Sequence, residues 1–242
     1  MNNIKPRLAI LSLGAGLALA LIGSSIAQST VVDILKTTQA NLEKSSWQAK
    51  VFGNFKTNGG TQEAEVAIQV IPRSEAIMRM EFQKPAPMEG NFTVLSKKEA
   101  WSYLFVSNQL VIEPRAGAKL SELAEQISGL SDVNDLSDQF NLKLEGEEQT
   151  ADGTAWKLSG TPKKSGQRFA SVEVLILKRD PRPLSLMLKD ADAKVIGTLN
   201  IRNFKRAKLT AKELMKYPSD AAPFRNTRPM RPEYPSTYGA PH

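Results

Sequence analysis

Few residues of this 242-residue chain carry the chemistry that enzymes use. The sequence has no cysteine, and its one histidine is the last residue, His242. A thiol nucleophile, a cysteine-ligated metal and a disulfide are therefore excluded, and histidine-based acid–base catalysis or zinc binding is not expected. No nucleophile elbow, phosphate-binding loop or dinucleotide-binding glycine motif occurs. The sequence thus predicts a protein that is not an enzyme and that uses no metal or cofactor.

Two groups of acidic residues remain as candidates for chemistry. Residues 132–138 begin with the spacing of a calcium-binding loop, but Leu136 stands at the fifth position and the required glycine and final glutamate are missing. We interpret these acids as the solvent-facing side of a helix. Glu147 and Glu148 are adjacent, so on a strand they point to opposite faces and do not form a paired-carboxylate site.

The positive signal is a row of apolar side chains on one face of an expected strand. Met78, Met80 and Phe82 alternate with Arg79 and Glu81. Methionine is flexible and polarizable, which suits a surface that accepts apolar guests of variable shape. The same alternation is also typical of an ordinary packed core, so core and cavity lining both remain open as interpretations.

The stretch WSYLFVSNQLVIEP, residues 101–114, raises the same question. Trp101, Tyr103 and Phe105 share one face of the expected strand, and Leu104 and Val106 share the other. Because both faces are apolar near the centre, we expect this strand to be covered on both sides. Its aromatic side chains either fill a closed core or line a cavity.

These residues must be positioned by a folded domain, which we expect to span residues 28–216. Before it, a basic start, an apolar run over residues 8–22 and a small-residue cleavage site predict a signal peptide, residues 1–27, that is cleaved after Ala27. An exported protein is therefore expected. After it, six prolines and scattered arginines predict a basic tail without fixed structure over residues 217–242.

The formal net charge of +7 is unevenly distributed. From Arg202 onward, nine lysines and arginines stand against three acidic residues, whereas residues 28–201 are close to neutral. The C-terminal arm is therefore the basic part of the chain. It could contact an anionic membrane surface or an acidic partner, or remain a solvated tail.

The domain begins with a helix and continues with strands. Apolar residues recur at helical spacing after Thr30, a candidate N-cap: Val31, Ile34, Leu35 and Leu42. From Trp47 the period changes to two, which predicts about eleven antiparallel strands. Between the sixth and seventh strands, residues 118–140 return to a helical period. Two short amphipathic helices are expected there, with one apolar stripe formed by Leu120, Leu123, Ile127 and Leu130.

The stretches IMRMEFQKPAPMEG and VLSKKEAWSYLFVSNQLV resemble the LolA family, the periplasmic carriers of outer-membrane lipoproteins. The family shows an apolar strand, a polar turn and then a Trp-x-Tyr strand. The matching positions are Met78, Met80, Phe82, Pro85, Trp101 and Tyr103. The expected order of elements also agrees over most of residues 30–205.

The resemblance implies a mainly β fold with α (α+β), an unclosed antiparallel β-barrel with an N-terminal helix and a helical lid insertion. Its hydrophobic cavity would bind the acyl chains of a lipoprotein or another lipid. The cargo would then cross the periplasm toward the outer membrane, between transient membrane-associated donor and acceptor proteins. The expected cavity residues are Val51, Phe55, Val66, Ile68, Met78, Met80, Phe82, Trp101, Tyr103 and Phe105.

In this interpretation the lid is the stripe from Leu120 to Leu130. The family places an arginine directly before a proline, and that arginine is linked to opening of the lid. Here the order is Pro72-Arg73, so Arg73 is the residue with which lid control is expected. The alternative is an interaction or sensor module of the same fold, with a closed core and a basic arm that binds a membrane or a partner. We expect a monomer and no nucleic-acid partner in either case.

Overall fold

The structure of the protein is a computed structural model that describes residues 30–57, 60–73, 75–118, 120–129, 132–164 and 169–226. The expected signal peptide, the lid residue Leu130 and the tail beyond residue 226 lie outside the described residues.

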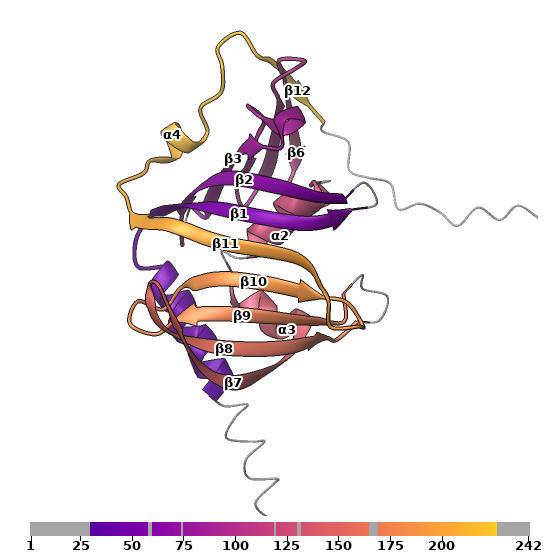
Figure 1. Ribbon diagram of the computed structural model, residues 1–242. Coiled ribbons are helices and arrows are strands. Elements are labelled where there is room, and N and C mark those ends of the chain that lie inside the picture. The colour runs from indigo at the N-terminus through magenta and orange to yellow at the C-terminus, as the bar shows by residue number, and fades with distance from the viewer. Residues whose placement is uncertain are drawn as a thin grey trace, which may run out of the picture.

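One twelve-stranded sheet forms the body of the protein (Figure 1). In chain order, the strands are β1 (Trp47–Thr57), β2 (Gly60–Ile71), β3 (Ile77–Lys84), β4 (Phe92–Leu95), β5 (Glu99–Leu104), β6 (Gln109–Pro114), β7 (Phe140–Thr150), β8 (Gly153–Pro162), β9 (Ser171–Leu177), β10 (Pro183–Lys189), β11 (Val195–Arg206) and β12 (Ala222–Arg225). Their order across the sheet is β12-β6-β5-β4-β3-β2-β1-β11-β10-β9-β8-β7. All neighbours are antiparallel except β12 and β6, which are parallel. Because β12 and β7 do not pair, the sheet stays unclosed, and the expected eleven antiparallel strands are confirmed as β1 to β11.

The described helices lie on the two faces of this sheet. An N-terminal helix covers residues 30–42, and the insertion between β6 and β7 forms α2 (Glu122–Gly129) and α3 (Asn134–Gln139). A 3-10 turn, η1 (Ala86–Met88), follows β3, and α4 (Ala211–Leu214) follows β11. Among the described residues, none of the helices is both long and apolar enough to cross a membrane.

The face that packs against the N-terminal helix, α2 and α3 is called the inner face. It carries an inner cluster of buried apolar residues drawn from these helices and from both halves of the sheet, including Leu35, Val51, Ile68, Met80, Ile127, Leu136, Leu158 and Leu199. The register of β2 and β3 explains part of this cluster. Val66, Ile68 and Val70 lie opposite Phe82, Met80 and Met78, so the alternating apolar residues of both strands point inward together.

The outer face has its own, smaller outer cluster over β3 to β6. Its buried members are Ile71, Ile77, Phe92, Val94, Trp101, Tyr103, Leu110, Ile112, Leu214 and Ala221. The last two belong to residues 207–221, a C-terminal strap that runs from the end of β11 to β12 (Figure 1). The outer face is therefore covered by a segment that lies far away in sequence.

The strap changes the expected boundary of the domain. We expected residues 217–242 to have no fixed structure, but residues 217–226 are described, and Ala222–Arg225 pairs with β6. The hydrogen bonds of this pairing and the burial of Leu214 in the outer cluster hold the segment in place. Prolines at positions 218 and 223 do not prevent this, because a short edge strand leaves one row of backbone groups unpaired.

Candidate functional site

Seven of the ten expected cavity residues lie on the inner face. Six are buried in the inner cluster: Val51, Val66, Ile68, Met78, Met80 and Phe82. Val66 and Met80 have no exposed surface. In this structure these side chains therefore pack as a closed core beneath the helices, which is one of the two interpretations that the sequence left open.

Phe55 is half-buried against the same cluster and lies over two glycines. A Cβ atom at Gly53 would be 2.6 Å from Phe55 Cε2, and one at Gly197 would be 3.2 Å from Phe55 Cδ1. Phe55 and Gly197 are register partners in β1 and β11. The ring thus occupies the space that the two missing side chains leave on the inner face.

The remaining three expected cavity residues are not on the inner face, which corrects the prediction. Trp101 and Tyr103 are buried in the outer cluster. Phe105 lies in the turn after β5 and is 60% exposed. The reason is the register: Tyr103 lies opposite Phe92, which lies opposite Glu81, and Glu81 points away from the inner face. The prediction that β5 is covered on both sides is correct only at Ala100, which belongs to the inner cluster, because Leu104 and Val106, on which it depended, are 44% and 91% exposed.

The three expected lid residues that the structure describes pack against the inner cluster. Ile127 is fully buried, and Leu120 and Leu123 are half-buried against the cluster. Val133 and Leu136, at the start of α3 and within it, continue this surface. The insertion therefore covers the inner face with apolar side chains from two short helices.

Only a few polar contacts tie α2 and α3 to the rest of the described chain. The Val133 backbone N–H donates to Gln39 Oε1 at 3.1 Å, and Lys163 donates from Nζ to the Ser137 carbonyl at 2.6 Å and from its backbone N–H to the Gln139 carbonyl at 2.9 Å. These contacts are at or near the ends of α3, and apolar residues of both helices add to the attachment. Apolar contacts are non-directional, so other apolar groups can replace them.

A cavity of about 420 Å³ opens where α2 and α3 meet one end of the sheet, and we call it the mouth. Its apolar walls include Leu42, Trp47, Val70, Met78 and Leu95, all members of the inner cluster. The mouth is therefore continuous with the apolar interior.

Charged residues of opposite sign line the two sides of the mouth. Arg73, Lys97 and Arg115 lie on the side of the sheet, Asp132 and Asp135 lie on the side of the lid, and Glu43 follows the N-terminal helix. Arg73, the expected lid-control residue, has a φ of 63°, a conformation that non-glycine residues rarely adopt. Of these cations only Arg73 is expected from the sequence, because no periodicity marks turn residues such as Lys97 and Arg115 that converge only in the fold.

The pKa of Asp135 is raised above its usual value. Burial is the main cause, and the nearby carboxylates of Asp132 and Asp138 add to it. An arginine or lysine in direct contact would have the opposite effect. In the described part of the chain, no ion pair joins the positive and negative sides of the mouth.

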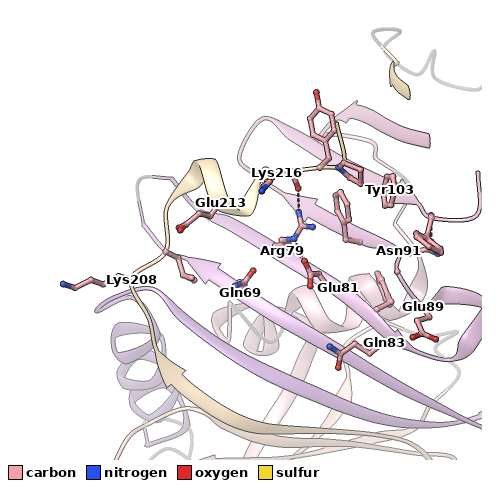
Figure 2. Close-up of a pocket in the computed structure, with 17 residues that line it drawn as sticks. Gln69, Arg79, Glu81, Gln83, Glu89, Asn91, Tyr103, Lys208, Glu213 and Lys216 are labelled. Atoms are coloured by element: carbon pink, nitrogen blue, oxygen red, sulfur yellow. Dashed lines mark hydrogen bonds and ion pairs between the residues drawn. The ribbon is translucent and has the colours of Figure 1, made fainter. Parts of the chain in front are cut away.

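A second, larger cavity of about 920 Å³ lies on the outer face beneath the strap (Figure 2). Arg79 fixes the strap there by donating from Nη1 to the carbonyls of Leu214 and Lys216, at 3.0 and 2.8 Å. Arg79 Nε donates to Glu81 at 2.7 Å, and the guanidinium stacks on the Phe92 ring, 3.9 Å from its centroid. The hydrogen bonds of Arg79 all go to groups of the protein itself, and two of them go to the strap, so Arg79 is a structural anchor of the strap.

The described residues offer no group of three or more carboxylate or histidine side chains that could hold a metal ion. What the arrangement offers is a large apolar layer under the two short helices α2 and α3, with a charged opening at one end.

No family model matches the sequence, and no curated protein matches it. Among solved structures, an uncharacterized conserved protein from Thermus thermophilus is 36% identical, with a TM-score of 0.64 over 81% of this chain and 99% of that chain. MucB is 16% identical, with a TM-score of 0.53 over 79% of this chain and 64% of that chain. A LolA superfamily protein from Nitrosomonas europaea is a more remote match, with 14% identity and a TM-score of 0.39 over 78% of this chain and 97% of that chain.

The class of protein is defined by its architecture, an unclosed antiparallel sheet whose inner face is covered by an N-terminal helix and a helical insertion, as the resemblance to the LolA family implies, and MucB shares this fold. The fold expected from the sequence is thereby confirmed. Within this class, the chain belongs to the same family as the uncharacterized conserved protein from Thermus thermophilus.

Proposed function

We propose that this protein binds the acyl chains of a lipidated protein, or of another lipid, between its sheet and the α2–α3 lid. It would carry that cargo through the periplasm toward the outer membrane, between membrane-associated donor and acceptor proteins. In this proposal the protein has no catalytic activity, and residues 1–27 act as a cleaved export signal.

The observation that carries the proposal is the apolar layer between sheet and lid. Residues from α2 and α3, such as Ile127 and Leu136, belong to the same buried cluster as Val66 and Met80 on the sheet. If the lid moves away, acyl chains can take the place of its side chains. Each buried CH₂ group contributes about 0.8 kcal/mol, so a long chain can compensate for the contacts that the lid gives up.

The helices of the lid are suited to such a movement. α2 has 8 residues and α3 has 6, and helices of this length are not stable alone in water. They depend on the apolar surface that they cover. Movement of a lid around a guest requires no covalent chemistry.

The test is a binding titration with residues 28–242 loaded with an environment-sensitive hydrophobic dye. We expect an acylated lipopeptide to displace the dye saturably and the same peptide without acyl chains to leave it bound. Equal behaviour of the two peptides, or no dye binding, would contradict the proposal.

A second candidate is an interaction module, and the covered outer face favours it. The strap creates a 920 Å³ cavity lined by Tyr103, Lys208 and Tyr217, among others, which offers aromatic and charged groups to a partner. MucB, whose fold this chain shares, has a structure in complex with MucA from Pseudomonas aeruginosa. Truncation after Asn226 removes the rest of the basic arm but keeps β12. Loss of membrane or partner binding by this variant, with acyl binding absent in both proteins, would favour the interaction module.

A further inference from the structure

The mouth carries three cations that have no ion-pair partner in the described part of the chain. Arg73 and Lys97 are exposed, and Arg115 is half-buried. No ion pair among the described residues includes any of them. Unpaired positive charges at one opening, with apolar walls behind them, form an environment that favours an anion attached to an apolar body.

Three acidic residues, Glu43, Asp132 and Asp135, also line the mouth, but no ion pair among the described residues joins them to these cations. A cation in contact with Asp135 would lower the pKa of its carboxyl group, whereas burial and the neighbouring acids raise it. The three cations are therefore available to an external anion while the lid is closed as it is here.

The wall of the mouth contains a second unused group. Trp47 is 3% exposed and lines the mouth, and its Nε1 donor is buried without an acceptor among the described residues. A buried donor without an acceptor lowers the free energy of unfolding. A ligand oxygen that reached this wall would supply the missing acceptor.

The mouth also joins the apolar interior directly. Trp47, Val70, Met78 and Leu95 are shared between the mouth and the inner cluster. A molecule with an anionic group at the mouth can therefore extend an acyl chain under the lid. Guanidinium groups bind carboxylates and phosphates with paired, charge-assisted hydrogen bonds, so two arginines and a lysine suit such a group.

We propose that the mouth is a headgroup site, in which Arg73, Lys97 and Arg115 bind the carboxylate or phosphate of an anionic amphiphile whose acyl chain lies on the inner face. Trp47 Nε1 donates to an oxygen of the same headgroup. This inference rests on the proposed acyl-binding function and adds the chemical class of the ligand.

The experiment compares amphiphiles that share one palmitoyl chain, using residues 28–242. The probes are palmitoyl lysophosphatidic acid, palmitic acid and the neutral monopalmitoylglycerol, each displacing the hydrophobic dye, with inorganic phosphate as the probe without a chain. We expect both anionic lipids to bind about tenfold more tightly than the neutral one, and added salt to reduce this preference. Inorganic phosphate at the same concentrations should not displace the dye.

The variant that tests the residues is R73Q/K97Q/R115Q. It should lose the preference for the anionic lipids while binding the neutral lipid as the wild type does. The control K56Q/K205Q/K212Q removes the same charge at exposed lysines for which no ion pair is found in the described chain, and it should keep the preference. R73K/R115K keeps the positive charge and should retain most of the preference for the anionic lipids.

The substitution W47F tests the indole donor separately. It keeps an aromatic ring in the wall and removes an unpaired donor, so we expect no loss of stability but a several-fold weaker affinity for the anionic lipids alone. An unchanged affinity would remove Trp47 from the site.

The outcomes separate the two proposals. Equal binding of neutral and anionic lipids, a preference that survives in R73Q/K97Q/R115Q, or displacement by inorganic phosphate would overturn the headgroup site and leave acyl binding intact. If none of the lipids binds, the acyl-binding function is wrong, and the headgroup site falls with it.

Discussion

At the scale of single residues, Arg79 shows how a charge in an apolar strand can be a structural element. It lies between Met78 and Met80, which point inward, and its own side chain points to the outer face. There it accounts for two hydrogen bonds to the strap, an ion pair with Glu81 and the stacking contact with Phe92. The alternation of charge and apolarity in this strand therefore reflects two covered faces rather than one wet face.

Arg79→Ala should destabilise the protein by about 2–3 kcal/mol, because two backbone carbonyls lose a charged donor. We expect the loss to be accompanied by faster amide exchange in α4 and the strap, measured by hydrogen exchange. Arg225→Ala removes a more exposed arginine that pairs with Glu99, and it should cost less than about 1 kcal/mol. Equal effects of the two substitutions would show that Arg79 does not anchor the strap.

Glu99 in β5 makes a pH-dependent contact with Arg225 of the edge strand β12. Its carboxylate accepts from Trp101 Nε1 at 2.9 Å and from Arg225 Nη1 at 2.8 Å, and its pKa is lowered, mainly by the bond from Trp101. A lowered pKa means that the ionised form stabilises the fold above the usual glutamate pKa, and that this stabilisation is lost as the pH falls through the folded-state value.

The substitution Glu99→Gln should therefore reduce the free energy of unfolding at neutral pH. The difference from the wild type should be constant above about pH 5 and shrink toward about pH 3. Urea unfolding at a series of pH values measures it. A difference that does not change over this range would show that the charge of Glu99 contributes nothing.

At the scale of elements, the lid is the part on which the proposed function depends. α2 and α3 cover the inner face mainly through apolar side chains, while α3 is also tethered at or near its ends. A lid that cannot move should exclude cargo even when every apolar residue is in place.

The chain has no cysteine, so a cross-link can be introduced without background. Ala76→Cys on the sheet side and Asp135→Cys on the lid side line the same mouth and can be joined by a flexible bis-maleimide. We expect the cross-linked protein to lose most of its uptake of the acylated lipopeptide, and the uncross-linked double variant to retain uptake. Each single-cysteine variant treated with the same reagent is the control. Full uptake by the cross-linked protein would contradict a mobile lid.

The elements were largely predictable from the sequence, but the faces of the sheet were not. Alternation within β2 and β3 correctly placed Val66, Ile68 and Met80 together, because both strands are adjacent in sequence and in the sheet. Trp101 and Tyr103 were expected on the same face of the sheet as Met80. Alternation fixes only which residues of one strand point together, so it could not test that expectation. The register between β3, β4 and β5 decides the rest, and it turns both aromatics outward.

The strap was not predictable for a related reason. Arg79 contacts Leu214 and Lys216, which lie 135 and 137 positions further along the chain, and no local pattern reports such contacts. Prolines after residue 217 indicated an unfolded tail, but pairing with β6 and burial of Leu214 outweigh that local tendency as far as residue 226. The mouth was missed in the same way, since Arg73, Lys97 and Arg115 come from three separate turns.

At the scale of the whole molecule, the sheet separates two environments. The inner face holds a continuous apolar layer under the lid, and the outer face holds a smaller cluster under the strap. Our account assigns the acyl chain to the inner face and gives the outer face a structural role. Two tryptophans report on these two environments, since Trp47 belongs to the inner cluster and Trp101 to the outer.

The most direct test is therefore quenching of these tryptophans by a neutral monoacylglycerol brominated along its acyl chain, because bromine quenches indole fluorescence on contact. One variant, W101F/W156F, keeps only Trp47, and the other, W47F/W156F, keeps only Trp101. We predict saturable quenching of Trp47 and none of Trp101. Quenching of Trp101 alone, or binding of the lipid without quenching of Trp47, would contradict an acyl chain on the inner face.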